Sequence, residues 1–104
     1  MPSTNSNRRS SPRAEVALGV TLARRHGNPL TTRTVDVGLG GMRVTAERPL
    51  AIDELLSFEL AFDGVAVAGR ARVMREERHH VYALCFEDLG DDATHMLLRL
   101  VARS

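Results

Sequence analysis

The chain has 104 residues, of which 43% are apolar, and its formal net charge is +1. This length and composition fit one small domain. No apolar stretch approaches the roughly 20 residues that a transmembrane helix needs, and no apolar signal-peptide core precedes the first turn. We therefore expect a cytoplasmic protein without membrane insertion. The single cysteine excludes an internal disulfide and a zinc ribbon.

The basic residues are all arginine, 14 in total, and they are distributed unevenly. Residues 1–35 contain six arginines against one acidic residue, whereas the remaining 69 residues have a net charge of −4. This asymmetry predicts an anionic partner at the N-terminal end. The chain has no lysine and only four aromatic residues, so it lacks the stacking platform of a DNA or RNA binder. A compact anion fits better, although genomic base composition also explains the absence of lysine.

The N-terminal half reads as a polar tail followed by short strands. Residues 1–12 have no apolar period, which predicts a flexible arginine-containing tail. Alternation of apolar and polar residues then predicts a half-buried strand over residues 13–22. After a turn at residues 26–29, Leu30–Val37 is rich in threonine and valine and reads as a second strand. Three glycines within residues 38–41 interrupt it, and alternation resumes afterwards.

The strongest strand signal lies in residues 54–62, where every second residue from Leu56 is large and apolar. The following Asp-Gly pair predicts a two-residue hairpin turn into a strand over Val65–Arg75. A further strand is predicted over Val81–Phe86. Six short strands at close spacing favour a small antiparallel barrel or sandwich.

The last segment changes to a helical period, with apolar residues at the 3, 4, 7 and 8 spacing of one face. These residues are Ala93, Met96, Leu97, Leu100 and Val101. Asp91 or Asp92 is expected to cap the helix start. A helix this short must pack against the strands. The sequence thus predicts an all-β fold, a six-stranded antiparallel β-barrel with a C-terminal α-helix, forming a single domain over residues 13–104.

Catalytic and metal-binding patterns are weak. The four histidines do not occur at metal-ligand spacing with cysteine or carboxylates, and the acidic run in residues 87–92 lacks the spacing of a calcium loop. Asp36 has no evident partner base or nucleophile. Cys85 lies in an apolar strand and is expected to pack in the core. We therefore expect neither an enzyme nor a metal or cofactor site.

Two elements carry the functional prediction. Three arginines lie in and just after the tail: Arg8, Arg9 and Arg13. The segment DVGLGG, residues 36–41, ends the second predicted strand. Together, in this order, they resemble the PilZ domain, the bacterial receptor module for cyclic di-GMP, whose pattern is R-x-x-x-R followed by [D/N]-x-S-x-x-G. The resemblance covers nearly the whole chain, because that family has a six-stranded barrel and a C-terminal helix.

The resemblance implies a cyclic di-GMP site built from six residues. These are Arg8, Arg9, Arg13, Asp36, Gly38 and Gly41. Arg9 and Arg13 match the first motif, and Arg8 is the arginine that commonly precedes it. Gly38 departs from the second motif, because the family has serine there. One lost hydrogen bond is worth about 0.5–1.5 kcal/mol, which predicts about two- to tenfold weaker affinity without loss of binding.

The chemistry of the ligand fits these residue types. Guanine offers O6 and N7 acceptors that a guanidinium binds bidentately. Its N1–H and N2–H donors need an acceptor, which Asp36 at the loop edge would supply. Gly41 would let the backbone approach the ligand, and loop N–H groups would bind phosphate. In the alternative interpretation, the arginines are a solubilising tail and the glycines a tight hairpin.

Two function classes follow. The first is a non-enzymatic cyclic di-GMP receptor or adaptor, monomeric or weakly dimeric, in second-messenger signalling of motility or biofilm formation. Its tail arginines would close over the ligand and present a surface to an unidentified output protein. The alternative is a degenerate PilZ-like adaptor in motility or pilus assembly that binds no nucleotide; Gly38 favours it, whereas Asp36 and the arginines argue against it. An enzyme acting on phosphodiesters lacks metal ligands and a nucleophile.

Overall fold

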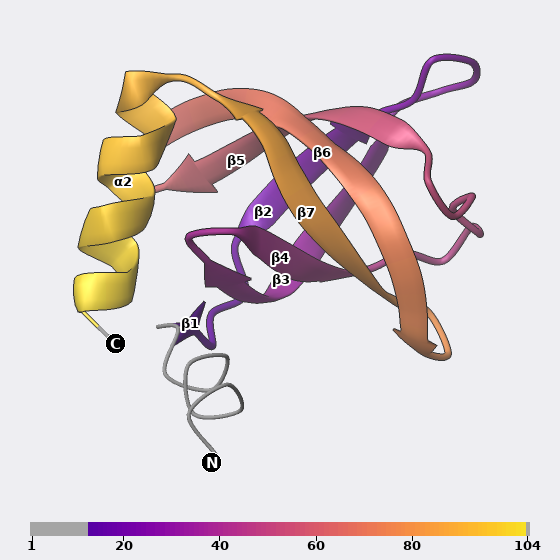
Figure 1. The fold of residues 1–104 in the computed structure, drawn as a ribbon, viewed down its shortest axis with the longest axis horizontal. Helices are drawn as coiled ribbons and strands as arrows, with labels where there is room; N and C mark the ends of the chain where they lie inside the picture. The colour runs from indigo at the N-terminus through magenta and orange to yellow at the C-terminus, as the bar shows by residue number, and fades with distance from the viewer. Residues whose placement is uncertain (1–12, 104) are drawn as a thin grey trace, which may run out of the picture.

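The computed structural model describes residues 13–103, which form seven strands and one helix. The strands are β1 (Arg13–Ala14), β2 (Gly19–Ala23), β3 (Leu30–Gly38), β4 (Gly41–Thr45), β5 (Leu55–Phe62), β6 (Val65–Arg78) and β7 (Val81–Leu89), and the helix is α2 (Asp91–Ala102). All strand pairs are antiparallel in the order β1-β3-β2-β5-β6-β7-β4, and a further β3–β4 pairing closes the barrel (Figure 1). The predicted six-stranded barrel with a C-terminal helix is confirmed, with β1 as a short extra strand.

The predicted first strand, residues 13–22, is broken into β1 and β2. Thr34 of β3 holds the break: its hydroxyl accepts from the Leu18 amide at 2.9 Å and donates to the Val16 carbonyl at 2.5 Å. A side chain thus replaces part of the backbone ladder across this stretch. The prediction of one continuous strand was wrong. Alternation of apolar and polar residues indicates which side chains are buried, and Val16 and Leu18 do pack against the core, but it does not show whether the backbone pairs with a neighbouring strand.

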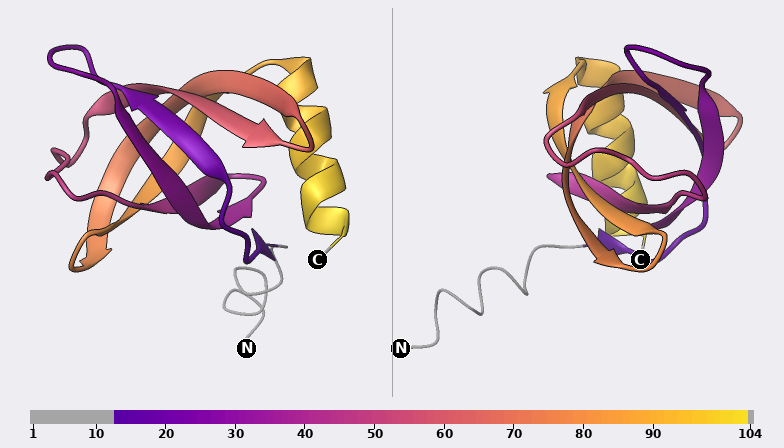
Figure 2. Two further views of the ribbon diagram at one scale, coloured as in Figure 1. Left: turned by 180° about the vertical axis from the view of Figure 1, so that it is seen from behind. Right: turned by 90° about the vertical axis from the view of Figure 1, so that its right-hand side faces the viewer.

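The β5–β6 hairpin forms as predicted. Asp63 and Gly64 have φ values of 53° and 75°, the left-handed geometry of a two-residue hairpin turn. From this turn β6 runs for 14 residues around the barrel, with three register shifts against β7. Such bulges bend a strand and increase its twist, so one long strand spans much of the barrel wall (Figure 2). The buried apolar residues fill the interior.

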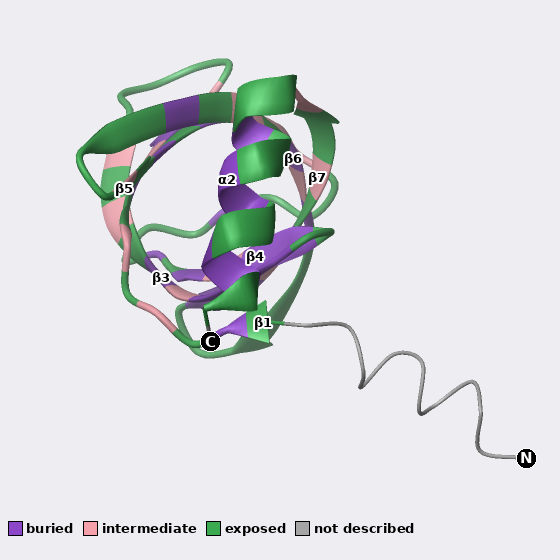
Figure 3. Ribbon diagram, turned by 90° about the vertical axis from the view of Figure 1, so that its left-hand side faces the viewer, coloured by how far each residue is buried: buried purple, intermediate pink, exposed green. Residues whose placement is uncertain are grey.

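The helix α2 covers one end of the barrel (Figure 3). Its buried face is the predicted one, and the helix packs against β1, β3, β6 and β7. The expectation that Asp91 or Asp92 caps the helix was wrong: Gly90 is the N-cap, so no capping side chain accepts from the first helical N–H groups. Both aspartates lie in the first turn instead, where their negative charge stabilises the helix by interacting with the positive end of its dipole.

One core prediction also fails. Cys85 is exposed, because its neighbours in β7, Leu84 and Phe86, point inward by the period of two. The apolar context of the cysteine therefore misled the prediction, and the strand period decides its side. No helix in residues 13–103 is long and apolar enough to span a membrane.

Candidate functional site

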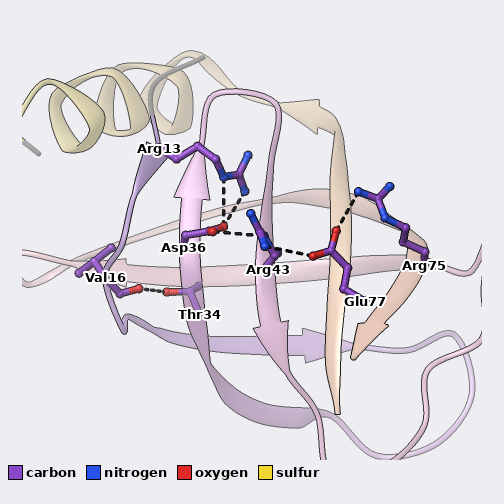
Figure 4. Close-up of polar contacts among 7 residues, drawn as sticks. All are labelled: Arg13, Val16, Thr34, Asp36, Arg43, Arg75 and Glu77. Carbon is purple, nitrogen blue, oxygen red and sulfur yellow. Dashed lines mark hydrogen bonds and ion pairs between the residues drawn. The ribbon is translucent and has the colours of Figure 1, made fainter. Parts of the chain in front are cut away.

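The first element of the site is β1, whose residue Arg13 pairs with Gly38 at the end of β3. The Arg13 guanidinium donates two hydrogen bonds to one carboxylate oxygen of Asp36, from Nη2 at 2.6 Å and from Nε at 3.2 Å (Figure 4). This pairing joins two predicted site residues that lie 23 positions apart in the sequence. The short extra strand is therefore what connects the N-terminal motif to the glycine segment.

Asp36 lies within β3, not at a loop edge, and its side chain is only 8% exposed. One carboxylate oxygen binds Arg13, and the other faces Nε of Arg43 at 3.2 Å. Burying a carboxylate is costly unless it is paired, and the two guanidinium groups offset that cost. Both oxygens that we expected to accept from guanine thus face arginines.

The glycine segment forms a tight connection between two strands. Gly38 ends β3, Gly41 begins β4, and Leu39 and Gly40 lie between them. A Cβ at Gly41 would collide with the backbone carbonyl oxygen of Leu84 in β7, whereas a Cβ at Gly40 would have no neighbour within 4 Å. Gly41 is therefore required for the close approach of β4 to β7, and its contact with a ligand stays a prediction.

A shallow hollow of about 300 Å³ lies on the outer surface beside this connection. Its charged lining residues are Arg13, Arg43, Arg75 and Glu77, and Gly40 and Gly41 of the connection also line it. A larger hollow of about 580 Å³ lies at the start of β5, but it contains neither motif. In residues 13–103, no group of histidine, cysteine or acidic residues is arranged to hold a metal ion. The smaller hollow is the candidate site for an anion, because three arginines line it beside the glycine segment.

Sequence reasoning missed three residues of this site. Arg43 binds Asp36 and, through Nη1 at 3.0 Å, also Glu77 Oε1. Arg75 Nη2 lies 2.8 Å from the other Glu77 oxygen. A cross-strand pairing of Asp36 with Arg43 was the available signal, but a register shift between Thr34 and Asp36 sets that pairing. Alternation alone does not reveal such a shift.

Comparison with known families and structures identifies the fold. The sequence model of the PilZ domain matches residues 7–103. The chain belongs to the PilZ family. The resemblance inferred from the two motifs is thus confirmed. PilZ domains are generally non-catalytic receptor domains, and the family typically binds cyclic di-GMP.

Solved structures agree with the family. The chain is similar to the Bacillus subtilis inhibitor of motility MotI/DgrA, with a TM-score of 0.75 and 18% identity over 92% of this chain and 50% of that one. It is also similar to the PilZ domain of CeSA from a cellulose-synthesizing bacterium, with a TM-score of 0.68 and 19% identity over 88% and 95% of the two chains. The chain thus spans half the length of the motility inhibitor. A comparison with curated proteins found no match.

The PilZ motif residues fall into two groups. Arg8 and Arg9 lie outside the described residues. The others lie where β3 pairs with both β1 and β4, and they are Arg13, Asp36, Gly38 and Gly41. Gly38, which replaces the PilZ serine, is paired directly with Arg13. The departure from the family pattern thus lies at the centre of the described half of the site.

Proposed function

We propose that this PilZ domain is a non-enzymatic cyclic di-GMP receptor that binds its ligand over the hollow beside the β3–β4 connection. The observation that carries the proposal is the ion pair between Arg13 and Asp36, which unites the two family motifs at that hollow. Arg43 and Arg75 line the same hollow. Together with Arg13 they carry three positive charges, against two negative charges on the carboxylates that they bind, Asp36 and Glu77.

Preorganisation supports this use of the arginines. Asp36 holds the Arg13 guanidinium by two hydrogen bonds, so less side-chain entropy is lost when Arg13 binds a phosphate or a guanine edge. Asp36 could accept hydrogen bonds from guanine N1–H and N2–H only if one of its carboxylate oxygens first released its arginine. In this proposal Asp36 therefore acts first as the residue that orients Arg13.

The signal is relayed through the tail. Arg8 and Arg9 belong to the predicted flexible tail, residues 1–12, which lies outside the described residues. We propose that ligand phosphates order this tail over the barrel and create a surface for an output protein in the cytoplasm. The similarity to an inhibitor of motility makes a motility component the first partner to test, with the receptor monomeric or weakly dimeric.

Isothermal titration calorimetry with cyclic di-GMP tests the proposal. Arg9→Ala and Arg13→Ala should each weaken binding by about 1.5–3 kcal/mol, the scale of a hydrogen bond to a charged group. Arg70→Ala is the matched control, since Arg70 forms an exposed ion pair with Asp88 away from the hollow, and its affinity should stay unchanged. Arg13 also neutralises the buried Asp36, so the affinity of Arg13→Ala is compared with wild type only after the fold of that variant is verified.

The opposite outcome identifies the alternative function. A folded wild-type chain that does not bind cyclic di-GMP would overturn the receptor proposal. It would favour the nucleotide-independent adaptor in motility or pilus assembly, which the glycine at position 38 already favours. Equal binding by wild type and both arginine variants would leave a receptor whose site lies elsewhere on the barrel.

A further inference from the structure

Arg43 and Arg75 belong to neither PilZ motif, yet they converge on the candidate hollow from two strands. In β4, Arg43 lies opposite Ala83 of β7, and in β6, Arg75 lies opposite the same residue. The three strands β4, β7 and β6 are neighbours in the barrel wall. Two guanidinium groups therefore flank a position where the intervening side chain is only a methyl group.

Glu77 joins these two arginines. Its Oε1 lies 3.0 Å from Nη1 of Arg43, and its Oε2 lies 2.8 Å from Nη2 of Arg75 (Figure 4). Glu77 falls at a register shift of β6 against β7, between Glu76 and Arg78. Bulged residues of this kind can direct a side chain away from the regular ladder, and here the carboxylate extends across the strands to Arg43.

The bound carboxylate resembles a phosphate in what it offers to arginine. Both are anions with several oxygens that accept hydrogen bonds from the guanidinium fork. The side chains are partly exposed, 22% for Glu77, 39% for Arg43 and 66% for Arg75, and ion pairs in contact with solvent are weak. An anionic ligand in the hollow can therefore replace Glu77 on both arginines without disturbing the core.

We infer that Arg43 and Arg75 are additional phosphate-binding residues and that Glu77 is an internal anion that occupies them until the ligand displaces it. The inference rests on the proposed function, since it takes cyclic di-GMP as the anion. Glu77 then lowers the affinity of the receptor and raises the ligand concentration at which it responds. This competition is independent of the tail arginines, because all three residues belong to β4 and β6.

Titration of Glu77→Gln with cyclic di-GMP tests the competition. Glutamine keeps the shape of glutamate but removes its charge, so we expect about three- to fivefold tighter binding, the scale of an exposed ion pair. Glu87→Gln is the matched control: Glu87 of β7 binds Arg72 of β6 at 2.6 Å, outside the hollow. It changes the net charge equally, and its affinity should match that of wild type.

Arg75→Ala is the second variant, because Arg75 is highly exposed and its loss should leave the fold intact. We expect about three- to fivefold weaker binding. In this background Glu77→Gln should give a smaller gain, because coupled residues are not additive. Unchanged affinity in Arg75→Ala overturns the inference even if the Glu77→Gln protein fails to fold.

The outcomes separate the inference from the proposed function. Equal effects of Glu77→Gln and Glu87→Gln, with a wild type that binds, overturn the inference and leave the receptor function standing. Binding by Glu77→Gln but not by wild type supports the inference and overturns receptor function for the native chain. If neither binds cyclic di-GMP, both proposals are overturned.

Discussion

Gly41 shows how one residue can serve packing inside a functional motif. A Cβ at this position would meet the Leu84 carbonyl oxygen of β7, which is backbone and cannot move aside. Gly41→Ala should therefore lower the free energy of unfolding by about 2–3 kcal/mol, as for overpacked sites. Urea denaturation measures this, with Gly40→Ala as the control because that position is open. Equal stability of the two variants would contradict the close approach of the strands.

Gly38 allows a second test at the scale of one residue. The glycines with left-handed φ in the described chain are Gly27 and Gly64, so serine at position 38 meets no backbone strain of that kind. Gly38→Ser restores the PilZ hydroxyl and should tighten cyclic di-GMP binding by about two- to tenfold. Calorimetry on the folded variant is the measurement. An unchanged affinity would show that this position makes no ligand contact.

The connection between β4 and β5 depends on one acidic residue. Glu54 accepts hydrogen bonds from Arg24 at 2.9 and 3.1 Å and from the Ala51 amide at 3.0 Å. The hydrogen bonds from Arg24 lower the pKa of Glu54 below the ordinary range of a glutamate. This contribution to stability is thus complete above the ordinary glutamate pKa of 4.5 and is lost as the pH falls through the lower folded value.

Replacing this carboxylate tests the role of the connection. Glu54→Gln should lower the free energy of unfolding by about 1–2 kcal/mol at neutral pH, and the difference from wild type should shrink below about pH 4. Urea denaturation across this pH range measures both, with Glu47→Gln in the same connection as the exposed control. A difference that persists at low pH would assign the loss to packing and not to charge.

Ligand binding should change the molecule unevenly. Hydrogen exchange with and without saturating cyclic di-GMP should show new protection in residues 36–41 and in residues 5–13, with little change along Leu55–Phe62, which lies on the barrel away from the hollow. Affinity should also fall with salt, because the Debye length shortens from about 10 Å at 0.1 M to about 3 Å at 1 M. Exchange in residues 5–13 that stays equally fast with bound ligand would refute closure of the tail.

Features that depend on neighbouring residues could be predicted from the sequence. The Asp63-Gly64 turn followed from residues that tolerate positive φ, and the buried face of α2 followed from the helical period. The PilZ motifs were visible as well, because each occupies a few consecutive positions. Local conformation and local spacing are properties of adjacent residues, so they can be recognised without the fold.

The contacts between residues far apart in the sequence depend on the fold of the whole barrel and could not be predicted. The break between β1 and β2 depends on the Thr34 hydroxyl from another strand. The contacts of Arg43 with Asp36 and Glu77 depend on register shifts in two strand pairs. A shift of one residue moves a side chain to the other face of a strand, and cross-strand register is set by packing of the whole barrel. The contribution of Arg43 and Arg75 to the candidate site could therefore not be predicted from the sequence.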